Sequence, residues 1–385
     1  MTPLESTREI LAALVGYPTI SLLPNRDLIA HAAQLLEDAG ARIHIFENEA
    51  GQANLFATIG PEADGGVVLS GHSDVVPPGD GGWSGDPFIL REQDGLLYGR
   101  GSCDMKGFIA AAVAMAPHYA ALPLRRPVHF AFTYDEEVGC LGAQRLVQDL
   151  KHIGVRPSAA IIGEPTEMRI IEAHKAVYEY ATEFTGLEGH ASEPDAGVNA
   201  IHSATRYMAK LLELEAEMKG RTPAGSPFSP PWTTLQIGRI EGGVMRNVIA
   251  RQCCIDWEMR PVTRADADHV RSALHVFCEE VLLPPMRAVH RNASIVTRTI
   301  GEVEGLEPAA LNEARDIVAE LTGANGADVV AFGTEAGLFQ SLGMSAVVCG
   351  PGSIAQAHKP DEYVSIDQLG ACLTMLGKLG DRLCR

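Results

Sequence analysis

The chain lacks any apolar run of the roughly 18 to 20 residues that a membrane-spanning helix needs, so we expect no transmembrane segment. It also lacks a basic segment followed by an apolar stretch at its start. The first residues, MTPLESTREILAAL, begin polar and then follow the pattern of an amphipathic helix, so we expect no signal peptide. The eight cysteines form no framework, and the adjacent Cys253 and Cys254 cannot form an ordinary disulfide bond. A reduced, cytoplasmic protein is the simplest interpretation.

Clusters of lysine and arginine are absent, and the formal net charge is −18. Nucleic acids and anionic membranes both attract basic surfaces, so we expect neither as a partner. The hydrophobic content of 46% is ordinary for a globular protein. At 385 residues the chain is too long for one typical core, which favours two domains.

Short apolar runs alternate with helical patterns in the first half of the chain. The runs predict strands, and the segments between them predict helices, with strands over 66–70, 127–134 and 159–162 and helices over 106–119 and 142–150. Strands that alternate with helices indicate an α/β fold with a largely parallel sheet covered by helices on both faces.

A second pattern interrupts the first and has the order β-α-β-β-α-β. Its elements are a strand over 177–186, a helix over 199–219, strands over 233–242 and 247–260, a helix over 264–282 and a strand over 293–300. This order is that of a ferredoxin-like α+β unit. We therefore expect residues 177–300 to form a domain inserted into a first domain of residues 1–176 and 301–385. Helices over 308–321 and 367–384 should complete the first domain.

Five potential metal ligands lie in tight, polar, turn-rich motifs. They are His72 in GHSDVVP, Asp104 in GRGSCDMKG, Glu137 in TYDEEVG, Glu164 in IIGEPTE and His358 in AQAHKPDE. Two imidazoles and three carboxylates suit a pair of divalent metals with one bridging carboxylate. The ligands cluster near predicted strand ends, where open α/β sheets place their sites. The set favours a hydrolase over a structural zinc protein.

Two further carboxylates lie beside these ligands. Asp74 follows His72 by two residues, so both side chains can point the same way. A metal-bound histidine usually donates its second ring N–H to a carboxylate, a role open to Asp74. Glu136 and Glu137 are adjacent and cannot easily bind one metal together. The pair suggests that Glu137 binds metal and that Glu136 faces a bridging water.

Each motif alone has a more ordinary interpretation. The H-x-D triplet can be a polar turn, an Asp in a glycine-rich loop a helix cap, the EE pair a solvated helix start, and GEPTE a type I turn. GRGSCDMKG also suggests a nucleotide loop, but it lacks the GK[ST] element of a P-loop. An inactive metal-binding or scaffold protein would be expected to have lost Glu136, which is present.

Together, the motifs GRGSCDMKGFIAA, DEEVGCLGA, IIGEPTEM, FGTEAGLF and GPGSIAQAHKPDEYV resemble the di-zinc amidohydrolase family, from about Gly71 to the C-terminus. The resemblance implies a role for each ligand: His72 and Glu164 on one metal, His358 and Glu137 on the other, and Asp104 between them. It implies two divalent metals per subunit, with zinc favoured and cobalt as an alternative.

The resemblance also implies the chemical roles of the neighbouring residues. Glu136 is expected to act as general base and then as acid, and Asp74 is expected to orient His72. The bridging aspartate of the family precedes a cis peptide bond, which predicts one at Asp104–Met105.

The inserted domain resembles the family's dimerisation domain, which implies a homodimer. His190, in GHASEPDAGVNA, would reach the partner's active site and stabilise the oxyanion. Asn247 and Arg260 match positions that contact the carboxylate end of the substrate. From its residue type alone, Arg260 is a candidate bidentate carboxylate clamp or an ordinary surface ion-pair residue.

The substrate implied is a small N-acyl amino acid. The motifs look most like the branch that hydrolyses N2-acetyl-L-ornithine in arginine biosynthesis. Another N-acyl amino acid, such as N-succinyl-diaminopimelate, or a dipeptide is the alternative. Glu335, in FGTEAGLF, is a candidate partner for the side-chain amine of ornithine. Its other interpretation is a residue at a helix N-terminus that interacts with the helix dipole.

Overall fold

The computed structural model describes residues 1–385. The chain divides into two compact units. The first unit comprises Met1–His174, Leu306–Val329 and Thr334–Arg385, and the second comprises Lys175–Gly305 with Val330–Gly333. The second unit is thus an insertion in the sequence of the first.

An eight-stranded sheet forms the centre of the first unit, in the order β1-β2-β6-β3-β7-β14-β8-β13. Its strands are β1 (Arg42–Glu47), β2 (Ala53–Ile59), β3 (Val67–His72), β6 (Val128–Thr133), β7 (Ala159–Pro165), β8 (Ile171–His174), β13 (Asp328–Val330) and β14 (Ser345–Gly350). The central strands β6, β3, β7 and β14 are parallel. Strands β1 and β2 on one side and β8 on the other pair antiparallel. The predicted parallel arrangement therefore applies to the centre of the sheet, where the ligand-bearing strands lie.

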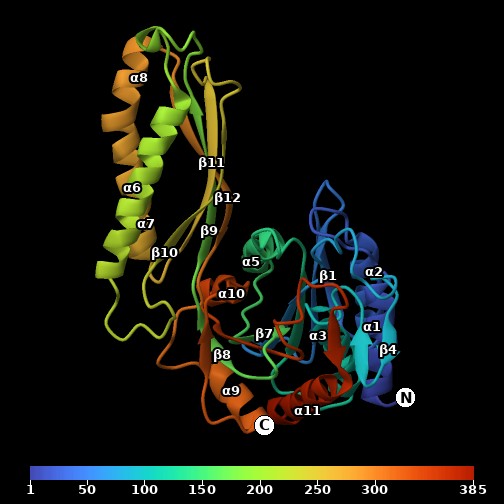
Figure 1. The fold of residues 1–385 in the computed structure, drawn as a ribbon. Helices are drawn as coiled ribbons and strands as arrows, with labels where there is room; N and C mark the ends of the chain where they lie inside the picture. Colours follow the sequence, from blue (N-terminus) through green and yellow to red (C-terminus); the bar gives the residue numbers. More distant parts are fainter. The chain divides into compact units, whose positions relative to one another are not determined.

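Helices cover both faces of this sheet (Figure 1). They are α1 (Pro3–Val15), α2 (Arg26–Asp38), α3 (Lys106–Ala114), α4 (Ala116–Ala120), α5 (Leu141–Ile153), α9 (Glu313–Thr322), α10 (Ala336–Ser341) and α11 (Ile366–Leu383). Because side chains alternate along a strand, Leu69 of β3 joins the core formed with α1, α2, α3, α9 and α11. The next side chain, Ser70, faces the opposite way and donates a hydrogen bond to Glu335, the residue before α10.

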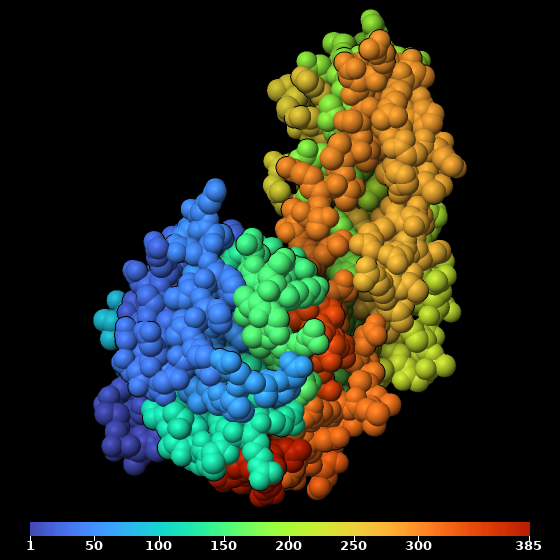
Figure 2. Space-filling view, turned by 180° about the vertical axis from the view of Figure 1, so that it is seen from behind, coloured from blue at the N-terminus to red at the C-terminus, as the bar shows by residue number.

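Segments far apart in sequence close the first unit. Figure 2 shows the C-terminal residues, in dark red, beside the segment near residue 120, in teal, and the Arg125 N–H accordingly donates to the Leu383 carbonyl over 2.9 Å. A small sheet of β4 (Arg91–Gln93), β5 (Leu96–Tyr98) and β15 (Tyr363–Ser365) lies next to the loops that carry two of the predicted ligands.

Some predicted boundaries differ from the observed ones for local reasons. The predicted helix over 106–119 is split at Met115, because Pro117 lies in the first turn of a short separate helix that begins at Ala116. The helix predicted from residue 308 begins at Glu313 because the Asn312 side chain accepts a hydrogen bond from Arg315 N and caps it.

The second unit contains a four-stranded antiparallel sheet in the order β10-β11-β9-β12. Its strands are β9 (Val177–Thr185), β10 (Thr234–Gly242), β11 (Gln252–Arg260) and β12 (Ser294–Val303). Helices α6 (Ala200–Gly220), α7 (Arg264–Phe277) and α8 (Leu283–Val289) pack on one face of it (Figure 1). Across the sheet lie the second, third, first and fourth strands of this unit, counted along the chain. Helix α6 connects β9 to β10, and α7 and α8 connect β11 to β12. This confirms the predicted ferredoxin-like fold.

The helix predicted over 264–282 extends further than its pattern indicated. It passes from α7 through a π-helical turn, Cys278–Leu282, into α8. No helix in either unit combines the length and the apolar character that crossing a membrane requires.

His129, on β6, is a buried histidine outside the ligand set. Its Nδ1 lies 2.9 Å from the Thr58 hydroxyl, and its ring stacks on Phe56. Burial lowers the pKa of His129 from 6.5 to about 4. Between pH 6.5 and about pH 4, the imidazole of His129 is therefore protonated in the unfolded chain but not in the native one. The free energy of unfolding decreases as the pH is lowered through this window.

We expect His129→Gln to remove this part of the acid sensitivity. The pKa of His129 is 6.5 in the unfolded chain and about 4 in the native one. This difference predicts that His129 accounts for roughly 2 kcal/mol of the free energy of unfolding that the native protein loses between pH 7 and pH 5. Urea denaturation at the two pH values should show a smaller drop for the variant than for the native chain. His44→Gln, at an exposed position, should leave the drop unchanged. Equal drops in both variants would contradict the assignment.

Candidate active site

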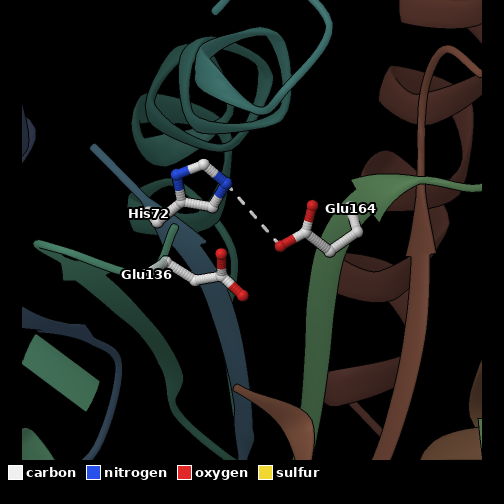
Figure 3. A group of neighbouring side chains, drawn as sticks. All are labelled: His72, Glu136 and Glu164. Atoms are coloured by element: carbon white, nitrogen blue, oxygen red, sulfur yellow. Dashed lines mark ion pairs between the residues drawn. The ribbon is translucent and has the colours of Figure 1, made fainter. Parts of the chain in front are cut away.

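Four of the predicted site residues meet at the carboxyl ends of three neighbouring strands. His72 is the last residue of β3, and Glu164 is the penultimate residue of β7. Glu136 and Glu137 follow β6 in a turn. Strands β6, β3 and β7 are adjacent and parallel, so their carboxyl ends share one edge of the sheet. Figure 3 shows the side chains of His72, Glu136 and Glu164 pointing toward one another.

Asp104 lies between the two predicted histidine ligands. Its Oδ1 is 3.0 Å from His72 Nε2, and its Oδ2 is 3.4 Å from His358 Nε2. Each oxygen of one carboxylate thus faces a different imidazole, which is the arrangement expected of a bridging ligand. The predicted cis peptide bond at Asp104–Met105 is confirmed.

Each histidine has a second carboxylate beside it. His358 Nε2 lies 3.0 Å from Glu137 Oε1, and His72 Nε2 lies 3.7 Å from Glu164 Oε1. Each histidine thus has one carboxylate of its own, and the two histidines share Asp104.

The donor atoms fit divalent metal ions. Ligand atoms of His72, Asp104 and Glu137 lie within 4.8 Å of one another, as do those of His72, Glu136 and Glu164. Glu164 Oε1 is buried without a hydrogen-bond partner, which is costly unless a cation satisfies it. Imidazole nitrogens and carboxylate oxygens are ligands that Zn²⁺ accepts.

Charge balance in the cluster also favours cations. Burial alone would lower the pKa of His72, but Glu164 and Asp104 raise it well above its usual value. Hydrogen bonds with Asp104 and Glu137 raise the pKa of His358 to about 10. Burial raises the pKa of Glu164, and the Asp104 carboxylate raises it further. The carboxylates thus hold protons on nearby groups, and metal ions would replace those protons on binding.

Asp74 contacts both the His72 ring and the Glu136 turn. Its main-chain carbonyl lies 2.9 Å from His72 Nδ1, whereas its carboxylate is 3.6 Å away. The carboxylate instead accepts hydrogen bonds from Glu136 N at 3.0 Å and Ser21 Oγ at 2.8 Å. In this geometry the main chain of Asp74 orients His72, and its side chain fixes the position of Glu136.

Glu136 lies beside the ligands and has no strong hydrogen-bond partner of its own. Burial raises the pKa of Glu136 well above its usual value, and the nearby Glu137 carboxylate raises it further. The Cys140 thiol, 3.4 Å from Oε1, is a weak donor to it. A carboxylate with a raised pKa in this position can take up a proton and return it.

The structure corrects the expectation for Glu335. This residue is 0% exposed, and its two carboxylate oxygens accept hydrogen bonds from Ser70 Oγ at 2.5 Å and Thr133 Oγ1 at 2.8 Å. A side chain with no exposed surface, bonded to two hydroxyls of the sheet, does not reach a substrate amine in an open site. Glu335 instead ties the cap of α10 to β3 and β6, the strands that carry His72 and precede Glu136.

The remaining predicted residues, His190, Asn247 and Arg260, lie in the second unit. A β-bridge between His190 and Val248 and a hydrogen bond from Ala191 N to Asn247 O bring His190 and Asn247 together. The Ser192 N–H donates to His190 Nδ1 over 3.2 Å. The Ser192 hydroxyl also lies 2.6 Å from Nδ1, so both side-chain contacts of His190 use Nδ1 and leave Nε2 available to another partner.

Arg260 already has a partner in the structure. Its Nε and Nη2 bond the two carboxylate oxygens of Glu258 at 3.1 and 3.0 Å. The guanidinium thus has the bidentate geometry predicted for carboxylate binding, with a side chain of the same strand as the acceptor.

Two functional candidates escaped the sequence reasoning: Arg100 and Glu362. They form a buried ion pair with an N–O distance of 2.7 Å, and Glu362 also bonds the main chain of Asp104. In the sequence, the one feature that could have indicated Glu362 is its place in the motif HKPDEYV, four residues after the candidate ligand His358.

Comparison with known proteins agrees with this geometry. Residues 68–381 match the peptidase family M20/M25/M40. The chain belongs to this family. One curated relative is the acetylornithine deacetylase of Myxococcus xanthus, which is 38% identical in sequence to this chain. The alignment covers 99% of this chain and 98% of the relative. That of Pasteurella multocida (strain Pm70) is 34% identical over the whole of both chains.

A solved structure has the same fold. The M20 family metallo-carboxypeptidase Sso-CP2 of Sulfolobus solfataricus superposes with a TM-score of 0.74 at 16% identity, over 98% of this chain and 99% of the other. The predicted family resemblance and the fold class are confirmed.

Proposed function

We propose that this chain is a metal-dependent amidohydrolase that converts N2-acetyl-L-ornithine to L-ornithine and acetate. The observation that carries the proposal is the geometry of Asp104, whose two oxygens face His72 and His358, with Glu136 beside them. Two relatives that bear the name acetylornithine deacetylase align over nearly the whole chain, which favours this substrate. The reaction would serve arginine biosynthesis in the cytoplasm.

We infer that the centre holds two divalent ions. His72 and Glu164 would hold one, His358 and Glu137 the other, and Asp104 would join them. Zinc suits this donor set, and cobalt would accept the same ligands. When bound, the two ions would lower the pKa of a water molecule and polarise the amide carbonyl.

Glu136 would move the proton of the reaction. Its carboxylate would take a proton from the attacking water and return it to the departing amine of ornithine. Glu136 lies within the same cluster as His72 and Glu164, so one carboxylate can serve both proton transfers. The hydrogen bond from Glu136 N to Asp74 Oδ1 would keep the carboxylate directed at the ligands.

We further propose that the enzyme works as a homodimer in which His190 serves the partner's site. Strand β9 begins two residues after Lys175, where the inserted segment starts, and extends for nine residues, roughly 30 Å. Strand β12 returns to the other junction at Gly305. His190 follows the far end of β9, so it lies at the end of the sheet opposite both junctions. This position, with Nε2 available to another partner, suits an oxyanion contact in another subunit.

Asn247 and Arg260 are our candidates for the carboxylate end of the substrate. Asn247 is exposed and lies next to His190, at the opposite end of β11 from Arg260, so with His190 it would serve the partner's site. Arg260 would bind the substrate carboxylate in place of Glu258, with the same two-bonded geometry that it has now.

Amine release from a panel of N-acyl amino acids, in the presence of zinc, tests the proposed reaction. We expect the highest kcat/KM for N2-acetyl-L-ornithine. Glu136→Gln protein, purified in parallel, gives the background from contaminating hydrolases. A preference for N-succinyl-diaminopimelate or for a dipeptide would replace the proposed substrate with the alternative one.

A further inference from the structure

A buried ion pair outside the ligand set lies at the base of the candidate metal centre. Arg100 Nη1 and Glu362 Oε2 are 2.7 Å apart, and the two side chains are 2% and 1% exposed. Ion pairs this deeply buried often contribute little to stability, because the loss of hydration offsets the attraction. The other contacts of the pair indicate a different role.

Glu362 fixes the main chain that presents Asp104. Its Oε1 accepts hydrogen bonds from the N–H groups of Cys103 at 2.9 Å and Asp104 at 3.0 Å. Its main-chain carbonyl accepts a third bond from Gly99 N at 2.9 Å. With Oε2 on Arg100, both carboxylate oxygens are engaged, so Glu362 holds the bridging ligand in place and is not itself a metal ligand.

Arg100 extends this support to two more loops. Its Nη1 lies 3.4 Å from the carbonyl of Lys359, the residue after His358. Its Nη2 lies 3.4 Å from the carbonyl of Pro77, in the loop that follows His72 and Asp74. One guanidinium thus bonds both the loop of His358 and the loop after β3.

The two halves of the centre differ in how they are held. His72 and Glu164 lie on β3 and β7, inside the central sheet. His358 lies on a loop, with a left-handed φ of 61° and a side chain 51% exposed. The geometry of the His358 half therefore depends more on the contacts of its loop, and Arg100 and Glu362 supply buried ones.

We propose that Arg100 and Glu362 are positioning residues that set the metal affinity of the His358 half of the centre. This inference rests on the proposed two-metal site. The pair fixes the position of Asp104 relative to the His358 loop, so that the Asp104 carboxylate can bind both ions. Partners behind metal ligands typically change metal affinity by about 10- to 100-fold.

Zinc binding to Glu362→Gln, in the full chain, tests the inference. A glutamine has one acceptor oxygen, so either the two amides or Arg100 must lose its partner. Metal-free protein is titrated with zinc against a chromophoric chelator, and its thermal unfolding is measured separately. We expect one zinc to bind as in the native chain and the other to bind about 10- to 100-fold more weakly.

Glu313→Gln is the control for the loss of one charge of an ion pair; its side chain is 35% exposed, whereas that of Glu362 is 1% exposed. Glu313 pairs with Arg126 at the same 2.7 Å, in the same unit, and neither residue contacts a ligand loop. This variant should bind both zinc ions as the native chain does. Should Glu362→Gln fail to fold, Arg100→Lys replaces it, because lysine keeps the charge but loses the fork that reaches Lys359 and Pro77.

The outcomes separate the inference from the proposed function. Native protein that binds fewer than two zinc ions would refute the two-metal centre and the inference with it. Native protein that binds two, with Glu362→Gln unchanged in both affinities but lower in melting temperature, would assign the pair to stability alone. An equal loss at both sites would also overturn the proposed selectivity for the His358 half.

Discussion

Glu136→Gln should lower kcat for N2-acetyl-L-ornithine by about 10²- to 10⁴-fold, because the amide cannot accept the proton of the attacking water. Zinc content should stay near the native value, since the five predicted ligands are untouched. Steady-state amine release and metal analysis on the same preparation measure the two effects together.

Glu137→Gln is the matched control for this variant, because it neutralises the adjacent carboxylate. Glu137 lies 3.0 Å from His358 Nε2, so its loss should reduce zinc content as well as activity. If Glu136→Gln lost zinc and Glu137→Gln kept it, the roles of the two residues would have to be exchanged.

His190→Ala should lower kcat by about 10²- to 10³-fold, the usual effect of removing one oxyanion donor. Zinc content should not change, because His190 lies in the second unit and its side chain bonds only Ser192. In the proposed dimer, a subunit with intact Glu136 and a partner with intact His190 together make one complete site.

Mixing His190→Ala chains with Glu136→Gln chains should therefore restore activity. With equal amounts and random exchange, half of the dimers are mixed and each has one complete site of two. Roughly a quarter of the native activity is expected. Proven subunit exchange without any recovery would place His190 in its own subunit's chemistry or in structure. Native mass spectrometry of the mixed chains, which differ in mass, measures subunit exchange independently of activity.

The ligand residues could be predicted from sequence because their motifs combine turn chemistry with a restricted set of donors. His72, Glu137 and Glu164 follow or end apolar runs, and parallel neighbours bring such ends to one edge. The antiparallel edge strands β1 and β8 were harder to foresee, because β1 is largely exposed and β8 has only four residues. Short or exposed strands give little of the periodic signal on which such predictions rest.

Glu335 shows why a motif does not reveal burial. A carboxylate before a short helix can face water, a substrate or the core, and the letters FGTEAGLF are the same in each case. Its burial follows from Ser70 on β3 and Thr133 on β6, whose hydroxyls meet its oxygens from far away in sequence. Arg100 and Glu362 illustrate the same limit, because their pairing joins positions 262 residues apart.

The sequence by itself determined the α/β class, the ferredoxin-like insertion and the identity of the metal-ligand candidates, because strand and helix periodicity and donor chemistry are local properties of the chain. The tertiary structure alone decided that Asp104 faces both histidines, that the Asp74 carboxylate accepts a hydrogen bond from Glu136 N, and that Glu335 is structural. These facts depend on side chains from separate strands and loops meeting at one sheet edge. Only the packed sheet fixes the distances of a few ångströms on which hydrogen bonds and metal coordination depend.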